Sequence, residues 1–389
     1  MATSASPTSG AVATLRPPPS EGICARGPSH AHTMQQWSQS LVRAIQTHDG
    51  AFLAAALDIC SPEAQARAQA LLSGVGVSVR GAGAGAPPTP AAVTAAVTEH
   101  LHSVSALRDG WDRVAACCLC ASAALQGACD TLALALMRDA LQENAFQRVL
   151  QDAEGSWVIA PLLRLVADCM TISSTPSCFP TRVDRDRELQ ALVDPVRNLF
   201  STCIMDKSTD VLADSKRIGS LATANLLLKL NFRLDVPKQC APVLQALQRP
   251  ILSDAARLAA FPTAQVVTLK YYMGRLSMYE DKYVEAEADL FFAFRHCHCG
   301  AEYHSQRRRI LEALIPVRLI LGILPSARLL EEYGFTSQYS GIVAGLRSGN
   351  IPAYRNALED NMEAFIKSGV YLTLDKLQLY VLRTLIKRL

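Results

Sequence analysis

The sequence predicts an all-α protein, a solenoid of short stacked helices similar to tetratricopeptide (TPR) repeats. Apolar residues recur at spacings of three and four over four long segments, which is typical of helices with one buried face. These segments are residues 131–150, 187–204, 211–230 and 237–247. Strand-like alternation is scarce, and short polar or proline-containing joints separate the segments. Many short helices in succession indicate a repeat array in which each helical hairpin packs on its neighbours.

One stretch carries the clearest repeat signal. A glycine is followed, at offsets of 12, 16 and 19, by an alanine, a leucine and an alanine, at Gly274, Ala286, Leu290 and Ala293. This is the small–small–large–small pattern of a tetratricopeptide hairpin. The first two small residues would let antiparallel helices approach closely, the leucine would fill the groove, and the last alanine would admit the next helix. The sequence YEDKY at 279–283 is the predicted polar turn.

The composition fits a large core and excludes a strongly basic surface over the whole chain. Of the 389 residues, 50% are hydrophobic and 19% charged, and the net charge is +3. A nucleic-acid contact would therefore need local clusters of basic residues. Several of the 12 cysteines sit in apolar helical runs, where a free thiol behaves as a small buried hydrophobe. The first residues lack the apolar centre of a secretory signal, so we expect a reduced, intracellular protein without a cofactor.

A long apolar segment at 114–137 has the length of a membrane span. It carries a single charge, Asp130, and could cross a bilayer. However, Gln126 and Gly127 interrupt it near the middle, together with Asp130, as a turn between two helices would. We therefore predict a buried helical pair here and no membrane insertion.

Two stretches have the composition of flexible chain. Residues 1–33 form a tail rich in Ser, Pro, Ala and Gly, and residues 73–92 form a Gly- and Pro-rich insertion. The long joint at 171–186 is a plausible boundary between two sets of helices. We therefore predict N-terminal helical repeats over 34–180 and a second set of repeats over 181–389.

The region after the hairpin predicts a further series of helices. Residues 310–321 form one buried helix with a kink at Pro316, ended by Gly322. Pro325 is expected to open the next helix, and Gly334 to cap its end.

The last predicted helix spans residues 372–389 and has an apolar stripe. The stripe consists of Leu374, Leu377, Val381, Leu382, Leu385 and Leu389. Basic residues lie beside or opposite it, at Lys376, Arg383, Lys387 and Arg388.

The sequence HCHC at 296–299 combines residue types that bind metals. Zinc needs four ligands in a tetrahedron, usually supplied as spaced pairs. Consecutive helical residues point about 100° apart and cannot converge on one ion, and His304 is the remaining candidate nearby. Cys297 lies four residues after Ala293, on the buried stripe. We therefore predict a packed cysteine with histidines at the rim, and no metal site.

Two basic clusters are the candidate contact residues. The first is Arg307, Arg308 and Arg309, which face solvent, pair with carboxylates such as Glu312, or contact an acidic partner or nucleic acid. Aromatic residues do not interleave with these arginines, so base stacking is not indicated. The second cluster is the terminal set Lys376, Arg383, Lys387 and Arg388. No catalytic motif stands out, and we expect no enzymatic activity.

The C-terminal half resembles a known family. The segments that carry the resemblance are VTLKYYMGRLSMYEDKYVEAEADLFFAFRHCH, LIPVRLILGILPSARLLEEY and SGNIPAYRNALEDNMEAFIKSGVYLTLDKLQLYVLRTLIKRL. They are similar to the PCI-domain-containing protein 2 family, which includes yeast Thp1-like and signalosome-subunit-12-like proteins. The resemblance is strong over 206–389 and weaker from Trp157 onward.

The resemblance implies a non-catalytic scaffold subunit of transcription-export complex 2 (TREX-2), which couples transcription to mRNA export at the nuclear pore. The implied partners are a large Sac3/GANP-like scaffold protein, a small acidic Sem1/DSS1-like protein and mRNA. The implied location is the nucleus at the nuclear pore, with the cytoplasm as a second location. A subunit of a signalosome- or proteasome-lid-like assembly, and a generic TPR adaptor, are the alternatives.

The resemblance also implies a further module, which we expect to be missing from this chain. A PCI domain is a helical-repeat stack capped by a winged helix, and winged helices of adjoining subunits form a basic platform for nucleic acid. In the family this module would follow Leu389. We therefore expect a truncated chain or an isoform without the module, and nucleic-acid binding by this form stays an open question.

Overall fold

A computed structural model confirms the all-α prediction. It describes residues 33–76, 90–104, 107, 110–127, 129–142, 149–150, 155–174, 181–207, 212, 214–253 and 255–388, and every regular element in these ranges is a helix. The predicted flexible tail lies outside the described residues except for residue 33, as does the centre of the predicted insertion, residues 77–89. Of the residues predicted to belong to the insertion, 73–75 end one helix and 90–92 begin another.

The chain forms two compact units. Unit 1 comprises residues 1–236 and 245–262, and unit 2 comprises residues 237–244 and 263–389. The predicted boundary at 180/181 therefore falls inside unit 1. The physical reason is that helix α9 (Arg182–Met205) packs on helices α6, α8 and α10 of the same unit.

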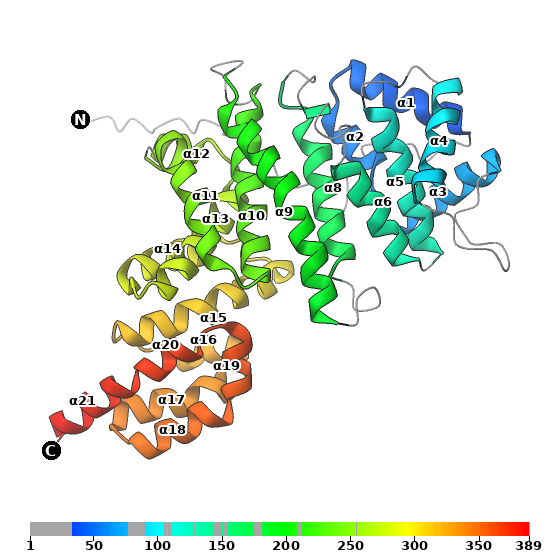
Figure 1. The fold of residues 1–389 in the computed structure, drawn as a ribbon. Helices are drawn as coiled ribbons and strands as arrows, with labels where there is room; N and C mark the ends of the chain where they lie inside the picture. Colours follow the sequence, from blue (N-terminus) through cyan, green and yellow to red (C-terminus); the bar gives the residue numbers. More distant parts are fainter. Residues whose placement is uncertain are drawn as a thin grey trace, which may run out of the picture. The chain divides into compact units, whose positions relative to one another are not determined.

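Unit 1 is a stack of helices that runs from α1 to α10 and ends with α12 (Figure 1). Besides α9, these are α1 (Met34–Gln46), α2 (Gly50–Ala56), α3 (Pro62–Val75), α4 (Pro90–Val104), α5 (Trp111–Gln126), α6 (Asp130–Gln142), α8 (Ile159–Ile172), α10 (Ser220–Arg233) and α12 (Ala255–Ala259). A 3₁₀ turn, η1 (Lys216–Gly219), precedes α10, and a π-helical turn, η3 (Gln248–Leu252), precedes α12. The helix predicted over 211–230 thus begins only at Ser220.

Side-chain caps explain where several of these helices begin. Ser61 Oγ accepts a hydrogen bond from the backbone N–H of Ala64 at 3.2 Å, and Pro62 occupies the first helical position. At the start of α9, Thr181 Oγ1 accepts from the backbone N–H of Asp184 at 3.2 Å. These caps satisfy N–H groups that have no partner inside the helix.

The long apolar segment at 114–137 is the predicted pair of helices. Helix α5 ends at Gln126, helix α6 begins at Asp130, and the two pack against each other. Among the described residues, no helix combines the length and the apolar character that a membrane crossing needs.

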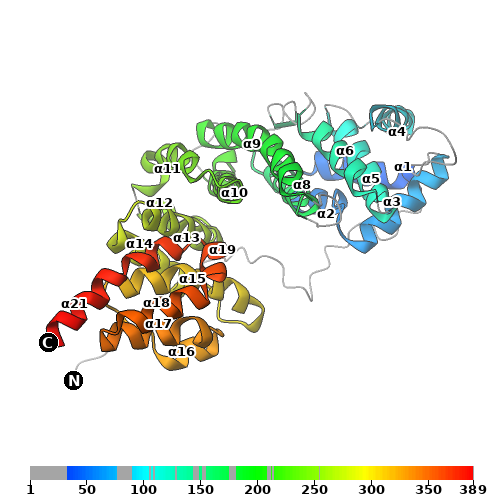
Figure 2. The ribbon, with the colours of Figure 1, turned by 60° about the horizontal axis from the view of Figure 1, so that its bottom comes forward.

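Unit 2 holds the predicted repeat hairpin and the helices that follow it (Figure 2). They are α13 (Thr263–Tyr279), α14 (Tyr283–His296), α15 (His304–Ile320), α16 (Ala327–Glu332), α17 (Thr336–Ser348), α18 (Ile351–Asp360), α19 (Met362–Ser368), α20 (Tyr371–Lys376) and α21 (Gln378–Arg388). The short elements η2 (Pro237–Gln239) and η4 (Ala301–Tyr303) are 3₁₀ turns, and α11 (Cys240–Leu247) crosses the boundary between the units.

The α13–α14 hairpin packs as the repeat pattern predicts. A Cβ atom placed on Gly274 would lie 2.6 Å from Leu290 Cγ and 3.1 Å from the carbonyl oxygen of Ala286. Ala286, Leu290 and Ala293 are each 0% exposed. Only a glycine therefore allows this approach of α13 to α14 without a shift of the neighbouring atoms.

Helix α15 continues through Pro316, which is buried inside it, to Ile320. Gly322 and Gly334 both have positive φ, at 81° and 68°, as predicted for residues that end helices. The next helix begins later than predicted. Ser326 caps α16 by accepting from the backbone N–H of Leu329, so Pro325 precedes the cap.

The predicted C-terminal helix is two helices, and part of its apolar stripe is exposed. A turn at Leu377 separates α20 from α21. Three residues of the predicted stripe, Leu374, Leu377 and Val381, are 0% exposed. Leu382, which also belongs to the predicted stripe, is 41% exposed, because α21 turns Val381 toward its neighbours. Leu389 lies outside the described residues.

Candidate functional site

Arg307, the first residue of the arginine triplet, binds its own chain. Its Nε donates to the Tyr333 hydroxyl at 2.8 Å, and its Nη1 donates to the carbonyl oxygen of Cys297 at 3.2 Å. The guanidinium carbon lies 4.3 Å from the centroid of the Phe294 ring, which is a cation–π arrangement. Arg307 therefore holds the end of α14 against the start of α15.

The side chain of Arg308 also binds groups of its own chain, whereas that of Arg309 is exposed. Arg308 Nη1 donates to the carbonyl oxygen of Tyr333 at 2.8 Å, and its guanidinium carbon lies 4.7 Å from the centroid of the Phe335 ring. It also pairs with Glu312, at 3.6 Å, which is one of the alternatives given for the triplet. Arg309 is exposed, and no hydrogen bond or ion pair of its side chain occurs within the described ranges. It is the triplet residue that remains available to a ligand.

The HCHC sequence is the end of a helix. Helix α14 ends at His296, and Cys297, 8% exposed, packs with Ala293 and Ile310 as predicted. His304 Nε2 lies 3.2 Å from the carbonyl oxygen of Glu332. In the part of the chain that the structure describes, no three or more His, Cys, Asp or Glu side chains are placed to hold a metal ion.

The terminal basic residues have two different environments. Lys376 forms an ion pair with Asp281, in the turn of the repeat hairpin, and Arg388 Nη1 donates to the carbonyl oxygen of Ser348 at 3.3 Å. The hydrogen bond from Lys376, followed by the one from Tyr283, lowers the pKa of Asp281. Arg383 and Lys387 are exposed on α21, and no ion pair of either side chain occurs in the described residues.

The two exposed cations of α21 border an exposed apolar stripe. The stripe consists of Leu379, Leu382 and Ile386, which are 70%, 41% and 63% exposed. In Figures 1 and 2, α21 lies along the edge of the α17–α18 pair, which it contacts through its other face. The predicted apolar stripe of the C-terminal helix contains Leu382 but neither Leu379 nor Ile386, although their spacing from Leu382, of three and four residues, is present in the sequence.

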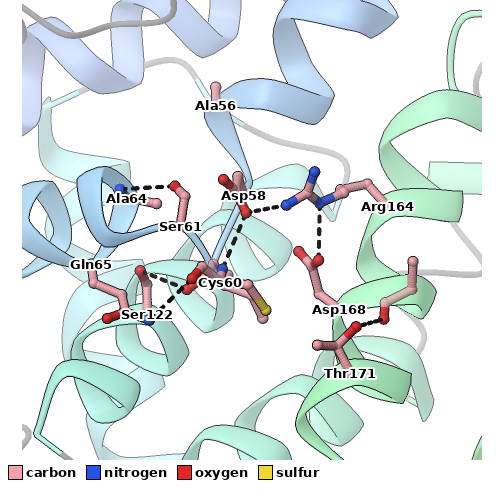
Figure 3. A network of polar contacts seen from close by, with 12 residues as sticks. Ala56, Asp58, Cys60, Ser61, Ala64, Gln65, Ser122, Arg164, Asp168 and Thr171 are labelled. Carbon is pink, nitrogen blue, oxygen red and sulfur yellow. Dashed lines mark hydrogen bonds and ion pairs between the residues drawn. The ribbon is translucent and has the colours of Figure 1, made fainter. Parts of the chain in front are cut away.

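Unit 1 contains a polar network that the sequence reasoning also missed (Figure 3). Arg164, on α8, lies between two carboxylates. It donates to Asp168 Oδ1 through Nε at 2.9 Å and bonds Asp58, in the loop between α2 and α3, through Nη2. Asp58 Oδ1 also accepts from the backbone N–H of Cys60 at 3.1 Å. The network ties the α2–α3 loop to α8.

The electrostatics of this network favour a structural role. Burial raises the pKa of Cys60 to about 12, and the charge of Asp168 adds to the effect, so the thiol stays protonated near neutral pH. Burial also raises the pKa of Asp168, whereas the charge of Arg164 opposes that rise. A protonated thiol is a poor nucleophile and a poor metal ligand, so the contribution of the network that the contacts show is to hold the α2–α3 loop against α8.

The described helices, packed as successive pairs, define an α-helical repeat protein. No protein-family model matches the chain. Against curated proteins, the chain is 30% identical to Enhanced ethylene response protein 5 of Arabidopsis thaliana over 252 residues, which is 63% of this chain and 57% of the plant protein.

Two further relatives carry the name of the family predicted above. The chain is 28% identical to the PCI domain-containing protein 2 homolog of Drosophila melanogaster over 246 residues, 63% of this chain and 60% of the fly protein. It is 32% identical to PCI domain-containing protein 2 of Xenopus laevis over 200 residues, 51% of this chain and 48% of the frog protein. These matches confirm the predicted resemblance to the PCI domain-containing protein 2 family. The chain spans about half the length of these curated relatives.

Proposed function

We propose that the chain is a non-catalytic scaffold subunit of a TREX-2-like complex that couples transcription to mRNA export at the nuclear pore. The observation that carries the proposal is the similarity of the chain to PCI domain-containing protein 2 proteins.

The proposed partners are a Sac3/GANP-like scaffold protein and a small acidic Sem1/DSS1-like protein. An acidic partner suits exposed cations of unit 2 such as Arg309, Arg383 and Lys387, whose side chains form no ion pair in the described residues. Opposite charges across an interface accelerate association and disfavour wrong partners. We propose a nuclear location at the pore, because that is where such a complex acts.

The same three cations are the proposed phosphate contacts if mRNA binds this form of the protein. Arg307, Arg308 and Lys376 are less suited, because each is engaged with its own chain. With a single-stranded nucleic acid, each phosphate contact makes the slope of log affinity against log salt concentration steeper by about 0.7. Substitution of Arg309, Arg383 and Lys387 by alanine should therefore flatten this slope. Arg307→Ala should leave the slope unchanged and should lower the stability of the protein instead.

Affinity purification of the tagged chain from nuclear extract, followed by mass spectrometry, tests the proposed assembly. A Sac3/GANP-like protein and a Sem1/DSS1-like protein should be recovered with the chain. Recovery of signalosome or proteasome-lid subunits in their place would contradict the proposal. A matched control is the same chain with Val183→Ser, since Val183 is 77% exposed on α9 and its loss should leave recovery unchanged.

A further inference from the structure

We propose that Cys299 is a redox-modification site, whose thiol exchanges with a small disulfide of the glutathione type and is then released by Cys297. The inference goes beyond the proposed scaffold function and does not depend on it. Three observations support it: the exposure of Cys299, the guanidinium of Arg307 beside its sulfur atom, and a second thiol two residues away.

Cys299 differs from the other cysteines in the described ranges by its exposure. It is exposed, whereas Cys60 and Cys129 are partly buried and the others, among them Cys117 and Cys297, are buried. It lies in the connection between α14 and α15. Because burial keeps a structural thiol from reagents, Cys299 is the described cysteine that a reagent in solution reaches first.

The sulfur atom of Cys299 is in direct contact with a fixed cation. Arg307 Nη1 donates a hydrogen bond to Cys299 Sγ at 3.0 Å. The Tyr333 hydroxyl and the ring of Phe294 hold the same guanidinium in place. Reactive cysteines are accessible and lie beside a cation, because the thiolate is the nucleophile and a positive charge favours it. Cys299 has these surroundings, whereas Cys60, whose pKa burial raises to about 12, does not.

A second thiol lies close to the same cation. Cys297, two residues before Cys299, is 8% exposed and packs with Ala293 and Ile310. Burial raises the pKa of Cys297, whereas the charge of Arg307 opposes that rise. The two thiols share one cation but differ in access, so Cys299 should react first and Cys297 second.

The reaction is thiol–disulfide exchange in two steps. In the first, the Cys299 sulfur attacks one sulfur of oxidised glutathione, a new S–S bond forms, and one glutathione leaves as its thiolate. In the second, the Cys297 sulfur attacks Cys299 Sγ and releases the other glutathione, which leaves a disulfide between the two cysteines. The protons of the two thiols pass through solvent to the two departing thiolates. Oxidised glutathione is the oxidant, and two molecules of reduced glutathione are the products.

The second step is coupled to the packing of α14 on α15. Cα atoms two residues apart are at most about 7 Å apart, close to the upper limit of about 6.8 Å for a disulfide, so a local rearrangement can form the bond. Cys297 must then turn away from Ala293, on α14, and Ile310, on α15. We therefore expect the second step to be slower than the first, and the oxidised chain to unfold at a lower temperature than the reduced chain.

Site-resolved alkylation kinetics test the reactivity of Cys299. The reduced chain is treated with iodoacetamide, an uncharged reagent, and the reacted fraction of each cysteine is followed by peptide mass spectrometry. Cys299 should react fastest among the cysteines of the described ranges. Arg307→Met should slow this reaction by about three- to tenfold, because the adjacent cation is lost. Arg309→Met is the matched control and should leave the rate unchanged, because Arg309 is exposed and makes no such contact.

Two measurements keep this test independent of the stability of the Arg307 variant. The buried Cys117 and Cys203 should stay unreacted in every variant, and their reaction would reveal unfolding. In the wild-type chain, raising the salt concentration from about 0.01 M to about 1 M shortens the Debye length from about 30 Å to about 3 Å and should slow the reaction of Cys299. Arg307→Met should remove this salt dependence, which a purely structural role of Arg307 would not produce.

Treatment of the chain with oxidised glutathione tests both steps of the exchange. In the wild type, a glutathione adduct on Cys299 should appear first and then give way to the disulfide with Cys297. In Cys297→Ser the adduct should accumulate, and in Cys299→Ser neither product should form in this loop.

Three results would overturn the inference. The first is alkylation of Cys299 that is no faster than that of the partly buried Cys129. The second is a rate that neither Arg307→Met nor salt changes while Cys117 stays unreacted. The third is a glutathione adduct that never gives way to the disulfide in the wild-type chain.

Discussion

Helices α5 and α21 are both rich in apolar residues, yet their surroundings differ completely. In α5, from Trp111 to Ala124, buried side chains lie on every side of the helix, because α3, α4 and α6 all pack on it. In α21 only Val381 is buried, and Leu379, Leu382 and Ile386 are exposed. The comparison shows that apolar content alone does not tell whether a helix forms the core or offers a binding face. The packing neighbours decide that, so equal substitutions in the two helices should have unequal effects.

The largest expected difference is between Leu119→Ala in α5 and Leu379→Ala in α21. Leu119 is 3% exposed and Leu379 is 70% exposed. The first substitution leaves a cavity and should lower the free energy of unfolding by about 2–5 kcal/mol. The second should stay within about 0.5 kcal/mol, because the removed atoms are largely in water. Urea unfolding of both variants measures the difference, and a large loss at Leu379 would show that α21 is covered within the chain.

The second prediction compares two glycines, one packed against a neighbouring helix and one without neighbouring atoms. Gly274→Ala places a Cβ atom against Leu290 and Ala286 and should destabilise the repeat hairpin by about 1–3 kcal/mol. Gly74, in α3, has no atom within 4 Å of the equivalent position. Gly74→Ala should therefore stabilise the helix by about 0.5–1 kcal/mol, since alanine favours a helix more than glycine does. Thermal unfolding should show shifts of opposite sign, and shifts of the same sign would contradict the close packing of α13 on α14.

The third prediction compares the stability loss from removing Arg164, in the polar network of unit 1, with the loss from removing Arg138, outside it. Arg164→Met leaves Asp58 and Asp168 without their shared cation and should cost about 2 kcal/mol, less than a fully buried pair because Arg164 is 41% exposed. Arg138 is 39% exposed and pairs only with Glu188 in the described residues, at 3.4 Å. Arg138→Met should therefore cost less than about 1 kcal/mol. Equal losses of unfolding free energy in the two variants, measured by urea unfolding, would show that the network contributes no more than the ion pair of Arg138.

The smallest expected effect concerns the ion pair between Lys376 and Asp281. Lys376 and Tyr283 lower the pKa of Asp281 below its ordinary value of 3.8, so the pair stabilises the protein above that pH and the contribution is lost as the pH falls through the lowered value. Lys376→Met should raise the pKa of Asp281 toward 3.8. Titration of the Asp281 carboxyl by NMR in both proteins measures the shift, and an unchanged pKa would show that the pair does not form in solution.

Much of the fold could be predicted from the sequence, because local patterns determine it. The spacing around Gly274 identified the hairpin, and Gly127 with Asp130 identified the turn between α5 and α6. The prediction that Cys297 is packed in the core is confirmed, and it rested on the position of Cys297 four residues after Ala293 in the sequence. In each case the information lies within a few helical turns of the residue concerned.

The candidate site was less predictable, because it depends on contacts that are distant in sequence. Arg164 and Asp58 are 106 residues apart, and nothing local links them. In the sequence, nothing distinguishes Arg307 and Arg308 from their neighbour Arg309. The difference is that both bind Tyr333, which is 26 and 25 residues further along the chain. The exposure of Leu382 depends on which side of α21 meets α17 and α18, and a helical pattern with apolar residues on two sides does not specify this.

The central claim is that the chain is a scaffold that binds export-complex partners. The most direct test is quantitative recovery of the Sac3/GANP-like protein with the wild-type chain and the Val183→Ser control. We predict that the Sac3/GANP-like protein is recovered with both, in equal amounts. Recovery of signalosome or proteasome-lid subunits in place of the Sac3/GANP-like protein would contradict the claim.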